Sequence, residues 1–332
     1  MAARSGQKIK LFYIVDILRE YSDENHPLNA NEICERLGAK GVTAERKAIY
    51  DDIETLVNYG FDIIKTHTPK NGFFLGEREF ETPEIFLLAD AVKTAKFISP
   101  KKTRKLVSKL ISMLSVYDRN ENKYGIFIDS DLKTKNEDIF YSIDTIHEAI
   151  KRGRQITFKY GMRELSTDRK IITTYKQHTV TPYAMTWQDD HYYLIANKDK
   201  YNNLMHTRID RMKSVEITDK KNRPVSEISN YSDTLDVADY TKRLFDMFGG
   251  DMEEVELICD KNILEQIADR FGEDIFIRNV TDTTFTFSAK LAISPALVTF
   301  IIKYGKEIVV KSPQKLRDMV KDRAQETADI YK

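Results

Sequence analysis

Three residues of one short segment, Arg46, Lys47 and Tyr50, have the types and the spacing needed to bind DNA. On a helix that begins near Thr43 they lie on or beside one face. Arginine can bind the edge of guanine in the major groove, and lysine and tyrosine can bind backbone phosphates. The segment therefore predicts a helix that reads DNA. The alternative is a small helical core with ordinary surface charges.

The rest of this segment has the pattern of an amphipathic helix. Its predicted inner face is apolar and consists of Ile49, Ile53, Leu56 and Val57. Thr43 has the residue type of an N-cap, Glu45 suits the positive end of the helix dipole, and Gly60 is typical of a helix end. One face is thus expected to pack inside the domain and leave the other face to solvent.

The segments around this helix predict a winged helix-turn-helix. An earlier helix over residues 8–21 carries an apolar stripe of Leu11, Ile14, Val15 and Leu18. A short second helix is expected between a capping box at Asn29 and Glu32 and Gly38. Two short strands around a PKNG turn follow Gly60. In such a domain the second helix of the motif reaches base edges. The predicted DNA contacts are Thr43, Arg46, Lys47, Tyr50, Lys65 and Lys70.

Two further helices are predicted after the winged helix. Thr82 and Ser99 are the expected N-caps, and each is followed by proline. One apolar stripe is expected from Leu87, Leu88, Ala91 and Ala95. Another is expected from Leu106, Leu110, Met113 and Leu114. The pair is either a dimer interface or a brace between the two halves of the chain. Residues 118–138 are predicted to be a loop, and another helix covers about 139–152.

From Arg154 the pattern changes to strands. Five short strands are predicted in about 65 residues, the first ending at Tyr160, which suggests a small barrel or sandwich. A short helix then ends at Gly249 and Gly250. The remaining segments have the order β-α-β-β-α-β-α, which is a ferredoxin-like unit with one extra helix. In its third strand, apolar Phe285 and Phe287 alternate with polar residues.

Several of these segments resemble the WYL-domain transcriptional regulators. The family pattern R-x-x-I-x-x-D-I-x-x-L is matched by Arg46, Ile49, Asp52, Ile53 and Leu56. The strand order ITFKY, TVTPYAMTW, HYYLIA and TRIDRM is similar to the WYL domain. Its Trp-Tyr-Leu triplet appears as Tyr192, Tyr193 and Leu194, and its basic signature as Arg208, Asp210 and Arg211. The K-Y-G-x-x-I-x-V-x-x-P run of the family's C-terminal extension occupies residues 303–313. The resemblance covers nearly the whole chain.

The resemblance implies an α+β multidomain protein. We expect a winged helix-turn-helix over 1–80, a helical linker or dimerisation region over 81–152, a WYL domain over 153–250 and a C-terminal extension domain over 251–332. The WYL domain of this family is an SH3/Sm-like β-barrel. The extension is expected to be the ferredoxin-like βαββαβ unit.

The resemblance also implies an effector pocket for an anionic ligand, such as a nucleotide or a nucleic acid strand. Its residues would be Tyr160, Tyr183, Tyr193, Arg208 and Arg211. Arginine suits phosphate, and tyrosine can stack on a base. The alternative is that the tyrosines are partly buried barrel residues and that Arg208 pairs with Asp210. Strand alternation predicts that one of Tyr192 and Tyr193 points inward.

Composition limits the other classes of function. The net charge is zero, with 52 basic and 52 acidic residues, so any DNA contact must rely on locally placed cations. There is no apolar run long enough to span a membrane, no signal-peptide pattern and no close cysteine pair, so a cytoplasmic protein is expected.

His191 and His206 lack a third metal ligand. No catalytic or cofactor-binding motif occurs, so neither an enzyme nor a cofactor is expected. Asp52 is expected to orient a neighbouring cation.

The sequence therefore predicts a homodimeric DNA-binding regulator that senses an effector. Dimer symmetry would impose palindromy on its operator. The alternative is an RNA-binding module in which the Sm-like barrel binds the nucleic acid.

Overall fold

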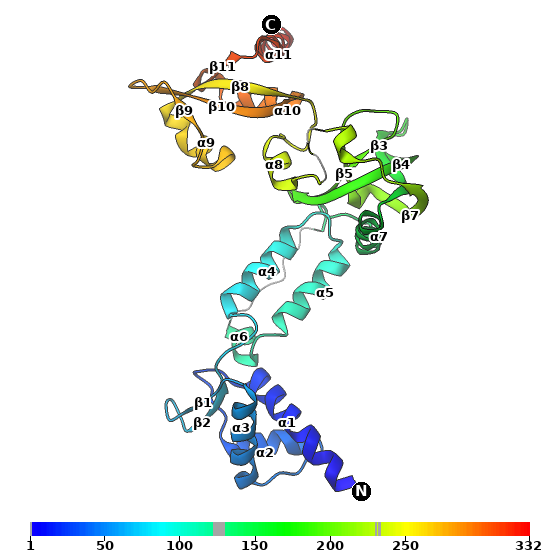
Figure 1. The fold of residues 1–332 in the computed structure, drawn as a ribbon. Helices are drawn as coiled ribbons and strands as arrows, with labels where there is room; N and C mark the ends of the chain where they lie inside the picture. Colours follow the sequence, from blue (N-terminus) through cyan, green and yellow to red (C-terminus); the bar gives the residue numbers. More distant parts are fainter. Residues whose placement is uncertain (1, 122–129, 230, 232–233) are drawn as a thin grey trace. The chain divides into compact units, whose positions relative to one another are not determined.

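The computed structural model describes residues 2–121, 130–229, 231 and 234–332. These residues form two compact units, Met1–Lys135 and Asn136–Lys332, and each is described by itself (Figure 1). None of the helices in the described ranges has the length and the apolar character to cross a membrane.

The first unit begins with three helices and a hairpin. They are α1 (Ala2–Tyr21), α2 (Ala30–Ala39), α3 (Arg46–Tyr59), β1 (Ile63–Thr66) and β2 (Gly72–Leu75). The predicted capping box is present, because the Asn29 side chain accepts from the backbone N–H of Glu32 while the Glu32 carboxylate accepts from that of Asn29. The order of elements is that of the predicted winged helix.

A shared apolar core holds the helices and the hairpin together. It includes Ile14 and Leu18 of α1, Ile33 of α2 and Ile49 of α3, all completely buried. Leu28 and Phe73 exchange two backbone hydrogen bonds of 2.8 Å, which join the hairpin to the helices. A Cβ atom at Gly72 would lie 2.9 Å from the backbone of Leu28, so this contact needs glycine.

Helix α3 differs from the prediction at its start and on one side. Its N-cap is Glu45 rather than Thr43, because backbone hydrogen bonds from Gly41 and Val42 hold the α2–α3 turn and the helix begins only after it. Val57 is exposed, since it lies about 100° around the helix from buried Leu56. Gly60 ends the helix in the left-handed conformation, as predicted.

The first unit continues with α4 (Thr82–Thr94), α5 (Pro100–Ile111) and α6 (Val116–Glu121). Ser99 caps α5 as predicted, but the N-cap of α4 is Glu81 and not Thr82. The backbone N–H of Glu81 donates to the Glu84 carboxylate at 2.8 Å, which places the start of the helix one residue earlier. Helix α6 occupies the start of the predicted loop. Residues 122–129 of that loop lie outside the described residues.

The buried side of α4 is not the predicted one. Ile85 and Ala89 are completely buried, whereas Leu87, Leu88 and Ala91 are exposed. Helix α4 packs against α5, and the two side chains that fit this contact lie four residues apart on one face. The periodicity of the segment allows two apolar faces, and only the packing decides between them.

The second unit begins with α7 (Ile139–Arg152), followed by a five-stranded sheet. The strands are β3 (Arg154–Leu165), β4 (Ile171–Gln188), β5 (His191–Asn197), β6 (Met205–Arg208) and β7 (Met212–Lys221). Their order is β6-β5-β4-β3-β7, with antiparallel neighbours throughout. Helix α7, expected in the linker region, packs against β3, β4 and β7 within this unit.

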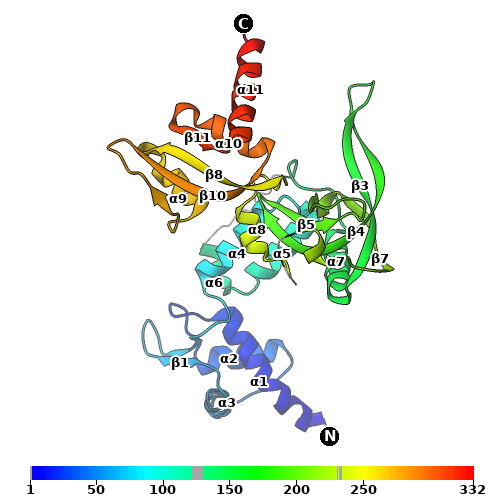
Figure 2. The same ribbon diagram turned by 45° about the horizontal axis from the view of Figure 1, so that its top comes forward.

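Two expectations about this sheet were wrong. Within the described residues β6 and β7 are edges that do not pair with each other, so the sheet is not a closed barrel. Strand β3 does not end at Tyr160, because residues 161–165 pair with residues 171–175 and extend the hairpin. Figure 2 shows this β3–β4 hairpin reaching beyond the other strands of the sheet. Five short strands do not reveal whether the two outer ones meet.

The rest of the second unit follows the predicted order of elements. After α8 (Val237–Lys242) come β8 (Asp251–Asp260), α9 (Leu264–Phe271), β9 (Ile277–Arg278), β10 (Thr284–Ile293), α10 (Pro295–Lys303), β11 (Ile308–Ser312) and α11 (Gln314–Ile330). The sheet order is β11-β8-β10-β9. Phe285 and Phe287 lie in its core. Helix α8 ends well before Gly249, which is earlier than expected. Single 3₁₀ turns occupy Ile209–Arg211, Val225–Glu227, Lys261–Ile263 and Gly305–Glu307.

Candidate functional site

A surface hollow in the first unit brings together four of the six predicted DNA contacts. It lies between the start of α2, the first half of α3 and the β1–β2 hairpin, and its volume is about 540 Å³. Arg46, Tyr50, Lys65 and Lys70 line it. Thr43 and Lys47 are exposed but are not part of the lining.

The side chains from α3 are held toward the hairpin. Tyr50 packs edge-on against Phe73 of β2, with ring centroids 5.6 Å apart. Its hydroxyl accepts a 3.5 Å hydrogen bond from Arg46 Nη2, one helical turn earlier. Arg46 is itself exposed. The guanidinium is therefore directed by its neighbours, while it keeps most of its donors for another molecule.

Lys70 has a structural partner that the sequence did not indicate. Its Nζ atom lies 2.6 Å from Glu32 Oε1 and so ties the hairpin to α2. Burial acts to raise the pKa of Glu32, but the hydrogen bonds from Lys70 and from the Asn29 N–H outweigh it and lower that pKa. Lys65 is exposed and has no ion-pair partner among the described residues. Lys65 is therefore the cation of this hairpin that is better placed to bind a phosphate.

Asn31, to which the sequence did not point, also lines the hollow. Asparagine can bind adenine through two hydrogen bonds. Asn31 follows the capping residue Asn29 and donates its backbone N–H to that side chain. Its place in the first turn of α2, beside the predicted recognition helix, is the signal that could have identified it.

A second hollow, of about 810 Å³, lies in the second unit beside β5 and β6. Four of the five predicted effector residues line it, namely Tyr160, Tyr193, Arg208 and Arg211. The other wall consists of Tyr240 and residues 246–251. A Cβ atom at Gly250 would lie 2.0 Å from the Ile293 carbonyl oxygen, so the chain passes close to β10 at this point.

Tyr183 is the predicted effector residue that the structure does not place in this pocket. It is the extra residue of a β-bulge in β4, because Pro182 pairs with Ala196 while Ala184 pairs with Ile195. A bulge turns the side chain away from its regular direction. The Tyr183 hydroxyl instead donates to the Arg223 carbonyl at 2.9 Å. Burial raises the pKa of Tyr183 to about 12.

Arg208 and Arg211 supply positive charge to the pocket in different ways. Arg208 donates two hydrogen bonds to Asp210, of 3.1 and 2.8 Å, which is the pairing that the sequence left as an alternative. Arg211 has a buried Nε atom with no hydrogen-bond partner among the described residues. A buried N–H of this kind costs about 1–3 kcal/mol when it stays unbonded. A hydrogen bond to an anionic ligand would therefore stabilise Arg211 more than Arg208, which is already paired.

The remaining polar groups of the pocket are neutral or paired. Burial lowers the pKa of His206 to about 4, so this ring is uncharged near neutral pH. Its Nε2 atom lies 3.0 Å from the hydroxyl of Tyr240. Burial also raises the pKa of Tyr193, which keeps that hydroxyl protonated. Tyr192 and Tyr193 are both half-buried, whereas the adjacent Leu194 is completely buried.

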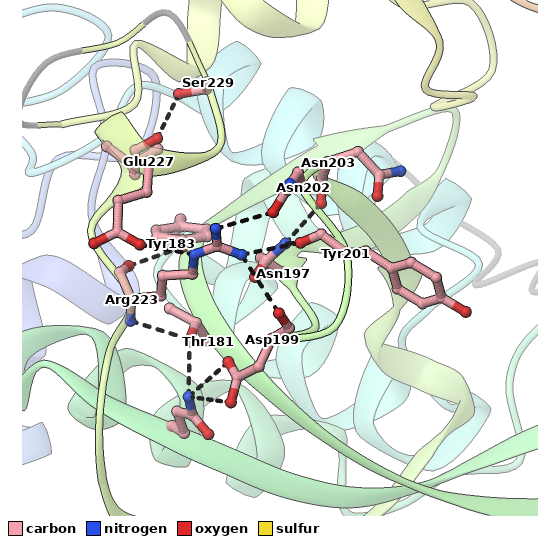
Figure 3. A network of polar contacts seen from close by, with 12 residues as sticks. Thr181, Tyr183, Asn197, Asp199, Tyr201, Asn202, Asn203, Arg223, Glu227 and Ser229 are labelled. Carbon is pink, nitrogen blue, oxygen red and sulfur yellow. Dashed lines mark hydrogen bonds and ion pairs between the residues drawn. The ribbon is translucent and has the colours of Figure 1, made fainter.

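A network around Arg223 positions the loop that enters this pocket. Arg223 donates to Glu227 at 2.9 Å, to the Tyr201 carbonyl at 3.1 Å and to Asn202 at 3.0 Å (Figure 3). Asp199 accepts from buried Gln155 at 3.0 Å. The next residues, 203 and 204, line the pocket. The sequence did not point to Arg223, because its partners come from another loop.

Segments of the chain are similar to known proteins. Residues 142–217 match the family model of the WYL domain, and residues 251–328 match that of the WCX domain. The chain is 23% identical over 295 residues to the uncharacterized HTH-type transcriptional regulator YobV of Bacillus subtilis (strain 168), covering 86% of this chain and 89% of YobV. These matches support the resemblance of the chain to the WYL-domain transcriptional regulators.

The WYL match runs from α7 into β7, and the WCX match runs from β8 into α11. The pocket of Arg208 and Arg211 therefore lies within the WYL domain and the segment that leads into the WCX domain. Among solved structures, the chain is similar to proteasome accessory factor B/C (PafBC) of Arthrobacter aurescens. The identity is 16% and the TM-score is 0.27, over 94% of this chain. The chain spans about half the length of that protein, 47%.

Proposed function

We propose that this transcriptional regulator binds operator DNA through α3 and the β1–β2 hairpin, and that its WYL domain senses an anionic effector. The observation that carries the first part is the hollow that joins Arg46 and Tyr50 of α3 to Lys65 of the hairpin. The name of the Bacillus relative supports DNA-dependent regulation. The two matched family models support the same assignment.

The charges indicate how the protein would bind. The outer face of α3 carries the side chains that suit base edges, and the hairpin carries a cation that suits the adjacent phosphates. Arg46, Lys65 and Lys70 are the arginine and lysine side chains that line the hollow, and Lys70 is already paired with Glu32, so few phosphate contacts are available there. The logarithm of affinity should fall with the logarithm of salt concentration by roughly 0.9 for each phosphate bound. We expect a shallow slope, with specificity from base contacts.

Selection of genomic DNA fragments by the purified full-length protein tests this proposal. We expect enrichment of duplex fragments that share one motif, and weaker binding of RNA of the same sequence. Absence of enrichment at low salt would contradict DNA binding. A preference for RNA over duplex DNA would favour the alternative, in which the WYL sheet is the nucleic-acid-binding surface.

The proposed assembly on DNA is a homodimer, with one winged helix in each half-site. A twofold-symmetric dimer requires a palindromic operator, with half-sites about one helical turn apart or a multiple of it. The enriched motif is therefore expected to be an inverted repeat.

The proposed effector contacts are Tyr160, Tyr193, Arg208 and Arg211. Arg211 supports this proposal most directly, because its Nε atom is buried without a partner among the described residues. An anionic ligand that accepted this N–H would favour one state of the protein by its differential affinity. The pocket also offers two tyrosine rings for stacking, which suits a nucleotide or a short single strand.

Replacement of Arg211 by alanine tests the effector pocket. With a nucleoside triphosphate and a short oligodeoxythymidine as probes, Arg211→Ala should weaken binding by about 1.5–3 kcal/mol, as expected for a hydrogen bond to a charged group. Arg163→Ala is the matched control, because Arg163 is exposed on the β3–β4 hairpin. Equal affinities of the two variants for both probes, measured by titration calorimetry, would contradict the assignment.

A further inference from the structure

The winged helix meets the helices that follow it through a joint of polar contacts. The members of its apolar core all lie between Leu11 and Leu75, so among the described residues this core takes none from α4, α5 or α6. The chain leaves β2 at Leu75 and reaches α4 through residues 76–81. Because the core ends at this boundary, individual contacts across the joint must fix the orientation of the winged helix.

Arg78 lies in this connection and contacts the ends of two helices. Its Nη1 atom donates to the Arg19 carbonyl of α1 at 2.9 Å, and its Nη2 atom donates to the Ser22 carbonyl at 2.7 Å. Nη1 also donates to the Met113 carbonyl, just after the end of α5, at 3.5 Å. The C-terminal end of a helix carries partial negative charge. One guanidinium therefore bridges the C-terminal ends of α1 and α5.

The bridge is partly buried and lies near two carboxylates. Burial lowers the pKa of Arg78, whereas Asp118 and Asp23 act to raise it. The hydroxyl of Ser115, a completely buried residue, lies 3.1 Å from a carboxylate oxygen of each aspartate. Asp23 follows α1, and Asp118 lies on α6. The acidic groups on the two sides of the joint are thus held near the same arginine.

A ring stack forms a second contact across the joint. The ring of His26, in the turn before α2, stacks on that of Tyr117 on α6, with centroids 3.7 Å apart and planes 3° from parallel. Asp23 Oδ1 lies 2.7 Å from Nδ1 of His26 and orients the ring. Arg119 of α6 also lies 3.8 Å from Glu20 of α1. The winged helix is therefore held to α6 as well as to the end of α5.

We propose that Arg78 is a positioning residue, which holds the winged helix in one orientation on α5 and α6 and thereby sets the half-site spacing that the regulator accepts. The proposal rests on the proposed function, because it requires two winged helices on one operator. Arginine suits this role, since its planar fork of N–H donors reaches carbonyls in several directions at once. Specificity for spacing then depends on a residue that contacts no base.

A small change of orientation at the joint becomes larger at the DNA. The C-terminal end of α3 lies at the joint, because Gly60, Phe61 and Arg78 line one hollow of about 410 Å³. Helix α3 has 14 residues and is therefore about 21 Å long. A tilt of about 10° at the joint would move its first turn by roughly 3–4 Å, about the rise of one base pair. The first turn of α3 is the part that we propose to contact bases.

Binding to DNA duplexes that differ in half-site spacing tests the proposal. The probes are the selected motif as a single half-site, as its natural inverted repeat, and as repeats lengthened or shortened by about two base pairs. Arg78→Met removes the hydrogen bonds and keeps much of the volume. We expect affinity for the single half-site to stay within about twofold. Affinity for the natural repeat should fall at least about tenfold, because the second winged helix is no longer preorganised.

The preference for the natural spacing is the decisive measurement. Arg78→Met should reduce this preference at least about fivefold, since a loosened winged helix also reaches the altered spacings. Arg78→Lys keeps the charge without the fork and should have an intermediate effect. Tyr117→Ala removes the ring stack and should relax the spacing in the same direction. Arg104→Met is the matched control, because Arg104 is exposed on α5, and it should keep the preference.

Three results would overturn the proposal. One is an Arg78→Met variant that keeps the preference of the wild type for the natural spacing. Another is an equal loss of affinity for the single half-site and for the inverted repeat, because that pattern indicates damage inside the winged helix. The third is relaxed spacing in Tyr117→Ala but not in Arg78→Met. Far-UV circular dichroism checks that each variant is folded.

A distance measurement without DNA separates this inference from the proposed function. Spin labels are placed at Lys47→Cys, in the first turn of α3, and at Lys101→Cys, in the first turn of α5, both exposed positions. The background is Cys34→Ser, since Cys34 is half-buried and Cys259 is buried. An excess of unlabelled chain restricts pulsed electron paramagnetic resonance to distances within one chain.

Arg78→Met should broaden this distribution of distances, and Arg104→Met should leave it unchanged. If the wild type binds no DNA but Arg78→Met broadens the distribution, the joint stands and the DNA proposal falls, together with the spacing that the joint would set. If the wild type binds the motif and Arg78→Met changes neither the distances nor the spacing preference, the inference about Arg78 alone falls.

Discussion

Replacing Lys10 by methionine is expected to lower the free energy of unfolding of the first unit by about 3–5 kcal/mol, the usual effect of removing one partner of a buried ion pair. Lys10 Nζ on α1 lies 2.6 Å from Asp52 Oδ2 on α3. The Lys10 side chain is 4% exposed and that of Asp52 is 16% exposed. Methionine fills a similar volume, so the substitution removes the charge and leaves the largely buried Asp52 carboxylate without its cation.

Urea denaturation followed by far-UV circular dichroism would measure this loss. Lys47→Met is the matched control, because Lys47 is exposed on α3, and its effect should stay within about 0.5 kcal/mol. The double variant Lys10→Met with Asp52→Leu should recover much of the stability, since it removes both charges. If Lys10→Met were as stable as the control, the ion pair would not be what holds α1 against α3.

This ion pair also matters for the proposed DNA contact. Asp52 lies on the same helix as Arg46 and Tyr50, and the pair anchors that helix to α1. The sequence predicted that Asp52 would orient a neighbouring cation, and Lys10 is that cation. Without the ion pair, α3 is held less firmly against α1 and its outer face is positioned less precisely. Lys10→Met should therefore also weaken operator binding, although Lys10 is not a proposed DNA contact.

Replacing Arg46 by alanine is expected to reduce affinity for the selected DNA motif by about 1–3 kcal/mol at each half-site, or roughly 5- to 150-fold. Arg46 is exposed and is directed by Tyr50, so its loss removes a base contact and leaves the core intact. The preference for one base pair, expected to be a G·C pair, should relax as well. Fluorescence anisotropy with the motif and with its base-substituted forms would measure both effects.

A phosphate contact should behave differently from a base contact. Lys65→Ala is expected to weaken binding of all sequences alike and to reduce the salt slope by about one. Arg163→Ala serves as the control for loss of charge away from the winged helix. If Arg46→Ala bound the motif as tightly as the wild type, the assigned face of α3 would be wrong.

Sequence alone determined the features that depend on residues a few positions apart. The capping box of Asn29 and Glu32 and the left-handed end of α3 at Gly60 were predicted because each is a local hydrogen-bonding or backbone preference. The order of the other helices and strands was also predicted from periodicity, but α6 was not. The resemblance pointed to Arg208 and Arg211, helical spacing pointed to Arg46 and Tyr50, and the predicted hairpin pointed to Lys65. The structure then placed these residues around two hollows.

Tertiary structure decided what depends on residues far apart in the chain. Lys70 pairs with Glu32, which is 38 positions away, and Lys10 with Asp52 on another helix. The β-bulge at Tyr183 and the unpaired edges of the five-stranded sheet depend on register between strands. Which apolar face of α4 is buried depends on α5. Periodicity shows that a face is apolar, but only packing against a particular neighbour decides which face is covered and which charge finds a partner.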